Sequence, residues 1–517
     1  MRTTRPLLFF ALTLAFATAL AHADITLAPL FRDHAVLQRD KPLPVWGRAD
    51  AGEHVTVTFR GQTVTTIAST NPADAGSWIV YLPPVAASAQ PAELTVTGTN
   101  PARPVHITDI LTGDVWLASG QSNMERRVNQ FQNAAEEIAA ANNPLIRVIT
   151  INRHESDTPA TDVETTGWLL TTPQTVADFS ATAYYFAREL QPRIGVPLGI
   201  VSSSWGGTKI EAWISANTLA TNPAFAPVAQ RWQKTLDAYH VAQTAKSAGA
   251  TQSRPIQNPK SSRATATVRQ IQNSIGPGHQ DTPSGLFNGM INPLLPFALR
   301  GVIWYQGESN TGRSNEYHAL FAAMITQWRA NFGQGDIPFF WVQLADYKGG
   351  GADHTDWAFL REAQTQTLSL PATGQAVTID IGDRNDIHPK NKQEVGRRLA
   401  LIARAKVYGA TVDYLGPTFA TAKREGTAMR VTFRAAGTDG LTSGNKPPQS
   451  FELAGADKIF HPATATINPA DNTILVTSPA VPAPVAVRYA WRNSPGANLF
   501  NSAGLPAVPF RSDDWAQ

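Results

Sequence analysis

The stretch that decides the fold is residues 115–125, which read VWLASGQSNME. Its first four residues, Val115 to Ala118, form a short apolar run of the kind that becomes a buried strand. A helical pattern follows from about Arg126 to Ala141. Ser122 therefore stands at a predicted strand-to-helix turn, where helix amides and the helix dipole are available to an anion.

Two other interpretations of Ser122 bear on its function. A serine in front of a helix is often only the N-cap of that helix. The segment also differs from the nucleophile elbow of α/β-hydrolases, because the Gly-x-Ser-x-Gly pattern needs a glycine where this chain has Met124. A lipase-type or peptidase-type site is therefore disfavoured.

Three further apolar runs have the same character as the first, at residues 199–201, 301–304 and 339–342. Each run is followed by small or polar residues, and helical patterns separate the runs. This alternation predicts an α/β domain with a parallel central sheet. Such folds place their chemistry beyond the carboxyl ends of the strands.

Short β-branched runs lie on both sides of this region. Those before it are at residues 55–59, 63–67 and 93–97, and those after it are at 429–433, 473–477 and 485–489. Proline, glycine, asparagine and aspartate interrupt them, as in small antiparallel sheets. We therefore predict β-domains at residues 24–110 and 410–517, flanking an α/β domain at residues 111–409.

Residues 214–283 form a polar stretch that we interpret as an insertion in the α/β domain. It contains a helical piece at residues 225–243 and a Pro/Ser/Asn-rich run at residues 252–262. A lid or substrate wall and a tolerated surface excursion both fit this composition.

The first 23 residues have the order of a secretory signal peptide. Arg2 and Arg5 precede an apolar run over residues 7–21, and small residues follow before Asp24. No later stretch has the roughly 18 apolar residues that a membrane span needs. We expect an exported protein, periplasmic or secreted, with no membrane insertion after the signal is cleaved.

Composition excludes several classes of function. The 43 Lys and Arg residues nearly balance the 40 Asp and Glu residues, for a net charge of +3, which gives no reason to expect a nucleic-acid partner. The chain has no cysteine, so disulfides, thiolate catalysis and cysteine metal sites are excluded. Its histidines lack the paired spacing of zinc sites, and we expect no metal. The sequence leaves the oligomeric state open.

A serine hydroxyl needs a base that an acid can orient. His388 lies in the segment DIGDRNDIHP at residues 380–389, directly after the apolar run at residues 376–379. A loop after a strand that contains one histidine and three acids is a candidate base-and-orienter unit. A polar turn with a solvated histidine is the alternative.

Acyl transfer also needs donors for the developing oxyanion. The segments SWGGT at residues 204–208 and WYQGESN at residues 304–310 follow two predicted strands. Gly206 or Gly207 could supply a backbone N–H, and Gln306 could supply a side-chain amide. Taken singly, these residues are an ordinary turn and a strand end. With Ser122 and His388, they predict one hydrolytic site.

These segments resemble the blocks of the sialate O-acetylesterase family, a branch of the SGNH hydrolases that includes carbohydrate acetylesterases. Similar stretches also occur near the start, after the histidine and near the end of the chain, at residues 31–38, 45–47, 360–364, 392–396 and 488–491. The likeness therefore spans nearly all of the expected mature chain. It implies a flavodoxin-like SGNH α/β domain flanked by β-domains, and no cofactor.

The resemblance also implies roles for individual residues. Ser122 would attack an acetyl carbonyl, with His388 as base and then acid. The Ser122 N–H, a glycine of the 206–207 pair, here assigned to Gly207, and Gln306 would form the oxyanion hole. SGNH enzymes often have an aspartate three residues before the histidine, and this chain has Asn385 there.

That departure leaves the orienting group open. We assign Asp386 as the orienting carboxylate, with Asp383 as the second choice. A Ser–His dyad assisted by a backbone carbonyl remains an alternative, in which Asn385 only shapes the loop.

Further residues are candidates for substrate contact or for support of the site. We expect Glu308 to belong to a hydrogen-bond network that fixes Gln306, with direct substrate contact as the alternative. The other candidates are Asn123, Gly206, Asn288 and Arg361, of which Asn288 and Arg361 have a purely structural alternative.

These features predict a serine esterase that removes O-acetyl groups from a carbohydrate through an acetyl-serine intermediate. A neutral oligo- or polysaccharide such as xyloglucan or xylan is slightly favoured over O-acetylated sialic acid, because the chain has 13 tryptophans to stack on sugar faces. A non-catalytic carbohydrate-binding protein on an esterase scaffold is the alternative.

Overall fold

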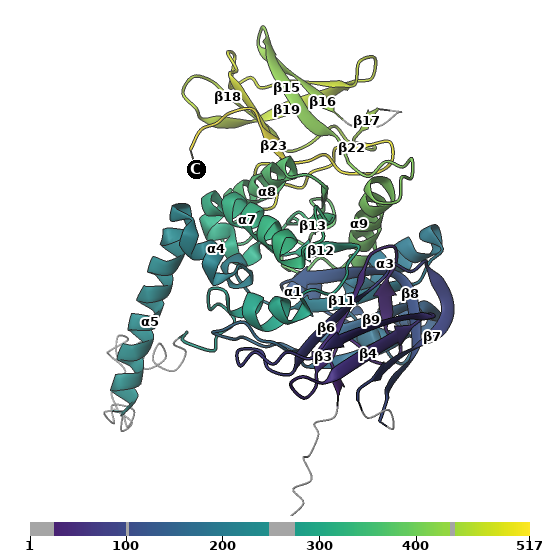
Figure 1. Cartoon of the computed structure of the whole chain (residues 1–517). Coiled ribbons are helices and arrows are strands. Elements are labelled where there is room, and N and C mark those ends of the chain that lie inside the picture. The colour runs from purple at the N-terminus through teal and green to yellow at the C-terminus, as the bar shows by residue number, and fades with distance from the viewer. Residues whose placement is uncertain (1–24, 100–102, 248–274, 435–439, 517) are drawn as a thin grey trace, which may run out of the picture.

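The structure is a computed structural model that describes residues 25–99, 103–247, 275–434 and 440–516. The predicted signal peptide and the Pro/Ser/Asn-rich run of the insertion lie outside the described residues. Figure 1 shows β-rich regions at the two ends of the described chain and a mixed region of helices and strands between them. Within the described residues, no helix is long and apolar enough to cross a membrane.

The N-terminal region consists mainly of antiparallel strands. Alternate residues of strand β4 (His54–Phe59) are buried, which is why Val55, Val57 and Phe59 form a core while the threonines between them do not. The remaining strands are β1 (Thr26–Leu27), β2 (Val36–Gln38), β3 (Leu43–Arg48), β5 (Gln62–Ile67), β6 (Ser77–Leu82) and β7 (Ser88–Thr97). This region is β-rich, as predicted.

Strand β8 (Val105–Gly120) connects this region to the central sheet. Its first part pairs with β7 and β2, and its second part is the middle strand of the central sheet. The predicted domain boundary between residues 110 and 111 therefore falls inside one continuous strand.

The central sheet has the order β10-β9-β11-β8-β12-β13-β14. All neighbouring pairs in it are parallel except β10 with β9. The strands not yet given are β9 (Asn143–Ile151), β10 (Thr165–Thr171), β11 (Leu198–Ser204), β12 (Gly301–Tyr305), β13 (Phe339–Val342) and β14 (Thr373–Ala376). The predicted α/β fold with parallel central strands is confirmed.

Helices cover both faces of this sheet (Figure 1). Ile303 and Phe340 belong to a core with helices α3 (Ala181–Ile194) and α9 (Lys392–Lys406), whereas their neighbours Trp304 and Trp341 belong to a core with α7 (Ser314–Phe332) and α8 (Asp356–Gln366). Because successive strand residues point to opposite faces, near-continuous apolar strands supply both cores.

The other helices are short or lie in the predicted insertion. They are α1 (Ser122–Glu125), α2 (Ala134–Ala140), α4 (Ala216–Thr221), α5 (Ala226–Ser247), the 3-10 helices η1 (Val128–Gln130), η2 (Val176–Asp178), η3 (Ile210–Trp213), η4 (Pro223–Phe225), η6 (Asn292–Leu294), η7 (Glu308–Arg313) and η8 (Thr367–Ser369), and the π-helix η5 (Phe287–Ile291). Helix α5 agrees with the helical piece predicted in the insertion.

The helix predicted from Arg126 to Ala141 was wrong in extent. Arg126 is extended, with φ −60° and ψ 143°. Its carbonyl accepts the Ala181 N–H at 2.9 Å, and the Val128 N–H donates to the Phe179 carbonyl at 3.0 Å. Pairing with this distant segment overrides the local helical pattern and leaves only α1, η1 and α2.

The C-terminal region is a seven-stranded antiparallel sheet of order β15-β16-β20-β19-β18-β21-β23, with a separate β17–β22 pair. Its strands are β15 (Thr418–Glu425), β16 (Ala428–Arg434), β17 (Leu441–Thr442), β18 (Phe451–Ala454), β19 (Phe460–Asn468), β20 (Thr473–Thr477), β21 (Ala486–Tyr489), β22 (Phe500–Asn501) and β23 (Phe510–Arg511). Val377 and Ile379, which follow β14, belong to the core of this sheet. The C-terminal region therefore anchors the segment that leads to His388.

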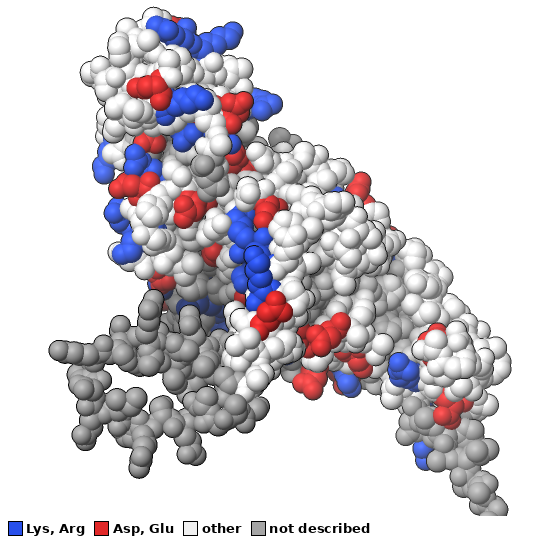
Figure 2. Space-filling view, turned by 90° about the vertical axis from the view of Figure 1, so that its left-hand side faces the viewer, with Lys and Arg blue, Asp and Glu red and all other residues white. Residues whose placement is uncertain are grey.

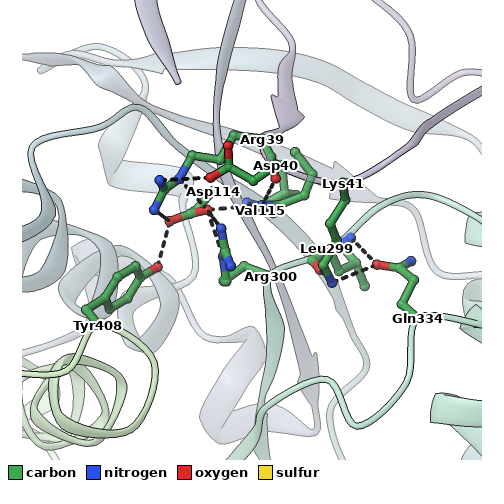
Figure 3. A network of polar contacts seen from close by, with 10 residues as sticks. Arg39, Asp40, Lys41, Asp114, Val115, Leu299, Arg300, Gln334 and Tyr408 are labelled. Atoms are coloured by element: carbon green, nitrogen blue, oxygen red, sulfur yellow. Dashed lines mark hydrogen bonds and ion pairs between the residues drawn. The ribbon is translucent and has the colours of Figure 1, made fainter. Parts of the chain in front are cut away.

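The buried carboxylate of Asp114 connects several parts of the molecule near the point where β8 enters the central sheet. Figure 3 shows Arg39, Arg300 and Tyr408 converging on this side chain. Arg39 follows β2, Arg300 precedes β12 and Tyr408 follows α9. One aspartate thus connects the N-terminal region, the central sheet and the helical layer.

Candidate active site

Three central strands end at one edge of the sheet and bring the predicted site segments together. The parallel register places Ser204 of β11 opposite Gly120 of β8, and Tyr305 of β12 opposite Gly120 on the other side. The segments that begin at Ser122, Gly206 and Gln306 therefore leave neighbouring strands at the same level.

Ser122 is the first residue of α1, directly after β8. A Cβ atom on Gly120 would lie 2.2 Å from the Tyr305 carbonyl oxygen, and the φ of Gly120 is +138°. Only glycine fits this position. The Gln121 N–H then donates to the same Tyr305 carbonyl at 2.9 Å. This close approach of β8 to β12 fixes the turn that presents Ser122.

His388 reaches Ser122 from the loop between β14 and α9. Its Nε2 lies 3.0 Å from Ser122 Oγ, and its Nδ1 lies 3.2 Å from Asp386 Oδ1. The His388 N–H also donates to Asp386 Oδ1, at 2.9 Å. Serine, histidine and aspartate form one hydrogen-bonded chain, which is the arrangement a nucleophile, its base and an orienting acid require.

The two other polar candidates of this loop do not contact the imidazole. Asp383 Oδ1 accepts the N–H groups of Asn385 and Asp386, at 2.8 and 3.3 Å. Asn385 Oδ1 accepts a hydrogen bond from Lys348 Nζ at 3.0 Å. Asp383 therefore shapes the loop, and Asp386 is the carboxylate beside His388.

The protonation states of the pair suit proton transfer from Ser122. Burial lowers the pKa of His388 below its usual 6.5, and the positive charge of Arg126 adds to this, while Asp386 opposes it. Burial alone would raise the pKa of Asp386, but hydrogen bonds from Lys390 Nζ and the His388 N–H lower it to about 2. At neutral pH the imidazole is neutral and the carboxylate ionised. With its proton on Nδ1, His388 can accept at Nε2.

The predicted oxyanion role of Gln306 is not supported, because its amide has no free donor. Gln306 is fully buried, and its Nε2 donates to the Thr208 carbonyl at 3.1 Å and to Asn310 Oδ1 at 2.8 Å. Its Oε1 accepts from the Tyr317 hydroxyl at 2.8 Å. Both amide hydrogens are committed. Gln306 instead anchors the loop that carries Gly207.

Gly206 and Gly207 differ in whether their N–H groups are already hydrogen-bonded. The Gly206 N–H donates to Glu125 Oε2 at 2.9 Å, so it is already occupied. A Cβ on Gly206 would lie 3.2 Å from Ser122 Cβ, which shows how closely this loop approaches the serine. Within the described residues, the N–H groups of Ser122 and Gly207 have no acceptor. These two amides remain as predicted oxyanion donors.

Glu308 and Asn123 form a different network from the one expected. Glu308 is buried, and its Oε1 accepts from Asn123 Nδ2 at 2.5 Å. Its side chain makes no hydrogen bond to Gln306 among the described contacts, so the expected link between these residues is wrong. Asn123 Nδ2 also donates to the Ile387 carbonyl at 3.0 Å. Asn123 thus connects the residue after Ser122 to the residue before His388.

Asn288 and Arg361 make no hydrogen bond to Ser122, His388 or Asp386 among the described residues. Asn288 Nδ2 donates to the Ser156 carbonyl at 3.0 Å. Arg361 is fully buried, and burial lowers its pKa to about 10. Its guanidinium donates to the carbonyl oxygens of Leu344, Ala345, Arg492 and Asn493. Arg361 therefore joins the end of β13 to the C-terminal region.

Sequence reasoning missed two side chains near the site, Lys392 and Arg153. Lys392 Nζ donates to Asn123 Oδ1 at 2.5 Å from a fully buried position. Arg153 Nε donates to Glu125 Oε1 at 2.6 Å, and its guanidinium lies over the Trp205 ring, 5.6 Å from the centroid. A signal for Lys392 existed, because a lysine at a helix N-terminus opposes the helix dipole and calls for an explanation.

The described residues contain no group of three or more His, Cys, Asp and Glu side chains placed to hold a metal ion.

Comparisons with known proteins match this arrangement to a family. The model of a carbohydrate esterase family, sialic acid-specific acetylesterase, matches residues 112–245 and 282–404, and the unmatched residues between lie within the predicted insertion. The sialate O-acetylesterase of Mus musculus is 30% identical, with 92% of each chain covered. That of Rattus norvegicus is 30% identical over 99% of this chain and 98% of its own.

A solved structure gives the same result. A carbohydrate acetylesterase from Xanthomonas citri is 40% identical to this chain, with a TM-score of 0.80 over 95% of this chain and 100% of its own. The resemblance inferred from the sequence motifs is thereby confirmed. On the length of these matches, the chain belongs to the sialic acid-specific acetylesterase family of carbohydrate esterases.

Proposed function

We propose that the protein hydrolyses O-acetyl esters of a carbohydrate through an acetyl-serine intermediate on Ser122. The observation that carries this proposal is the continuous chain from Ser122 Oγ to His388 Nε2 at 3.0 Å and from His388 Nδ1 to Asp386 Oδ1 at 3.2 Å. A site that only bound carbohydrate would not need this chain, since binding a sugar does not require a base beside a serine.

The reaction runs in two halves. Ser122 Oγ attacks the acetyl carbonyl carbon and gives its proton to His388 Nε2, while Asp386 stabilises the imidazolium. The Ser122 and Gly207 N–H groups hold the oxyanion. Collapse of the intermediate breaks the bond to the sugar oxygen, which takes the proton from His388. A water molecule then gives a proton to His388 and attacks the acetyl-serine carbonyl carbon. Collapse of this second intermediate breaks the bond to Ser122 Oγ, which takes the proton from His388, and acetate leaves.

For the substrate, we propose a neutral acetylated oligosaccharide. Trp205 is half-buried and directly precedes Gly206, which lies against Ser122. Arg153 lies over its ring, and the charge of Arg153 is paired with Glu125. An aromatic ring and a charge-balanced guanidinium suit contact with hydroxylated, uncharged sugar. Figure 2 shows basic and acidic side chains interspersed on the face that it draws.

A second candidate is an acetylated acidic sugar, which one observation favours. Arg126 is half-buried, and its positive charge helps to lower the pKa of His388, so it lies near the base. Within the described part of the chain, no acceptor is recorded for its guanidinium. A substrate carboxylate could pair with it. Arg126→Gln should then slow an acidic ester far more than a neutral ester when both are assayed at pH 8, well above the usual histidine pKa of about 6.5, where the accompanying rise in the pKa of His388 has little effect.

The test is acetate release from 9-O-acetylated sialic acid, acetylated xylan, acetylated xyloglucan oligosaccharides and 4-nitrophenyl acetate. Wild type is compared with Ser122→Ala. We expect rapid turnover of at least one carbohydrate ester and a loss of about 10³-fold or more in the variant. If no ester is cleaved, or if Ser122→Ala is as active as wild type, the esterase proposal fails and a carbohydrate-binding function replaces it.

Two further proposals concern the fold type and the localisation of the protein. We propose that the central sheet is the flavodoxin-like SGNH hydrolase arrangement, with the parallel order of β9, β11, β8, β12 and β13 in support. We also propose export, periplasmic or secreted, with cleavage after Ala23. Intact-mass measurement of the protein recovered from the periplasm or medium should give a chain that begins at Asp24, and an uncleaved chain confined to the cytoplasm would contradict export.

A further inference from the structure

Lys392 is a buried cation that the esterase mechanism does not use. It begins helix α9, and only 1% of its surface is exposed. Its Nζ lies 4.9 Å from the ring centroids of both Phe131 and Tyr305. Removing an ammonium group from water is unfavourable, so a lysine in this position needs compensating partners.

The compensation comes from one amide and one carboxylate. Lys392 Nζ donates to Asn123 Oδ1 at 2.5 Å, and Asn123 Nδ2 donates to Glu308 Oε1 at 2.5 Å. The cation can meet only the amide oxygen, and the carboxylate can meet only the amide nitrogen. The pair of opposite charges therefore fixes which way the Asn123 amide points.

This orientation has a consequence for the proposed nucleophile and base. The second hydrogen of Asn123 Nδ2 donates to the Ile387 carbonyl at 3.0 Å. Asn123 follows Ser122 on α1, and Ile387 precedes His388 in its loop. If the amide turned over, its oxygen would face the Ile387 carbonyl and the link between the two segments would be lost.

We propose that Lys392 and Glu308, acting through Asn123, form a positioning unit that holds the Ser122 turn and the His388 loop at reacting distance. The proposal rests on the esterase function argued above. None of the three side chains contacts the reacting atoms, so they are positioning residues. Their effect is on the 3.0 Å contact between His388 Nε2 and Ser122 Oγ, and thus on the rate of acyl transfer.

The charge of Lys392 also reaches His388. Lys392 is one of the groups that lower the pKa of His388, after burial and Arg126. Burial lowers the pKa of Lys392 to about 7, with Arg126 and Lys390 acting in the same direction and Glu308 and Asp386 opposing it. Below that pH the lysine is mainly protonated. Removal of its charge should therefore raise the pKa of His388.

The first experiment compares Lys392→Met with Lys406→Met, a control at the other end of the same helix whose Nζ donates to the Thr373 carbonyl. The substrate is 4-nitrophenyl acetate, which needs no sugar contact. We expect kcat of Lys392→Met to fall about 100-fold, as for a misplaced reacting group, with KM within about threefold of wild type. The acidic limb of its pH–rate profile should move to higher pH. Lys406→Met should match wild type in both.

A double variant separates positioning from general damage to the fold. Asn123→Ala should lower kcat to a similar degree, and Lys392→Met with Asn123→Ala should be no slower than the slower single variant, because both act through one amide. Glu308→Gln, which conserves volume, gives a third variant if Lys392→Met does not fold. We expect kcat to fall about tenfold in it, as a charge-assisted hydrogen bond is weakened.

The proposal is overturned if Lys392→Met keeps the activity and pH profile of Lys406→Met, or if the losses of the two single variants multiply in the double variant. The same assays distinguish failure of the esterase proposal. In that case wild type itself cleaves no ester, or Ser122→Ala is as active as wild type.

Discussion

Asp386 and Asp383 lie three residues apart in one loop, yet only Asp386 contacts the His388 imidazole. Replacing Asp386 with Asn leaves an amide that cannot stabilise the imidazolium and favours the wrong tautomer. We expect Asp386→Asn to lower kcat by about 10⁴-fold, the scale of such losses in serine hydrolase triads. Initial rates on 4-nitrophenyl acetate measure this.

Asp383→Asn is the matched control. The asparagine oxygen can still accept the N–H groups of Asn385 and Asp386, so activity should stay within about threefold of wild type, since Asn caps a turn as well as Asp. Equal losses in the two variants would mean that Asp386 does not orient His388 and that a Ser–His dyad carries the reaction.

In the proposed mechanism, the lowered pKa of His388 sets the acidic limit of activity. Burial and Arg126 disfavour the imidazolium, so the base form persists below pH 6.5, the usual value. We expect the acidic midpoint of kcat/KM to lie below 6.5. A pH series with 4-nitrophenyl acetate between pH 4 and 9 measures it, with irreversible inactivation checked by return to pH 7. A midpoint above 6.5 would contradict the burial argument.

Individual site residues were predictable from the sequence where motif and chain position sufficed, as for Ser122, His388 and Asp386, which the structure brings together. Gln306 shows where this stops. Its position at a strand end suggested a free donor. In the structure, the Thr208 carbonyl and Asn310 Oδ1 accept both of its amide hydrogens, and nothing in the sequence pattern marks these two residues as its partners. Which hydrogen bonds a side chain makes depends on the packing of the folded chain, and the local sequence does not reveal it.

At the scale of elements, the loop after β11 places a glycine against Ser122. A Cβ on Gly206 would lie 2.9 Å from Glu125 Oε2 and 3.2 Å from Ser122 Cβ, although the backbone there suits any residue. We expect Gly206→Ala to displace Ser122 or Glu125 and lower kcat by about tenfold or more, because small misplacements of reacting groups are costly. Steady-state kinetics on 4-nitrophenyl acetate measure this.

Gly312 provides the control for this loop. It lies in η7, and a Cβ there would meet nothing within 4 Å. Gly312→Ala should therefore keep kcat within about twofold of wild type, as expected of an exposed position without contacts. Unchanged activity in Gly206→Ala would show that the loop can retreat, and that its approach to Ser122 has no part in catalysis.

The strands were more predictable than the helices. Four apolar runs became β8, β11, β12 and β13 because buried parallel strands need continuous apolar sequence. The helix expected at residues 126–141 failed because Arg126 and Val128 pair with residues 179–181, a contact between segments about fifty residues apart. Local periodicity cannot report such pairing.

At the scale of the whole molecule, the β-rich ends are integral to the site. β8 is shared between the N-terminal region and the central sheet, and Val377 and Ile379 tie the approach to His388 into the C-terminal core. The sequence texture predicted β-rich regions at both ends. It could not show that a boundary drawn at residue 110 falls within a strand, because the change in texture occurs along one continuous β8.

Asp114 joins these regions through the polar contacts drawn in Figure 3. The side chain is fully buried and accepts hydrogen bonds from Gln38, Arg39, Arg300 and Tyr408. Burial would raise the pKa of Asp114, but its hydrogen bond from Arg39 and the charges of Arg300 and Arg39 lower it below 3.8. Its stabilisation is therefore present above that pH and declines as the pH falls below it. Asp114→Asn leaves Arg300 without its counterion and Arg39 with only the more exposed Asp40, and it should cost about 3–5 kcal/mol. Urea unfolding at pH 7 measures the loss, and Asp178→Asn, which removes an exposed ion pair with Arg127, should cost less than about 1 kcal/mol. Asp114 lies within β8, at the start of its central-sheet part, and makes no hydrogen bond to Ser122, His388 or Asp386 among the described residues. Folded Asp114→Asn should therefore keep the kcat of wild type. A stability equal to that of Asp178→Asn would show that the regions are joined by apolar packing alone.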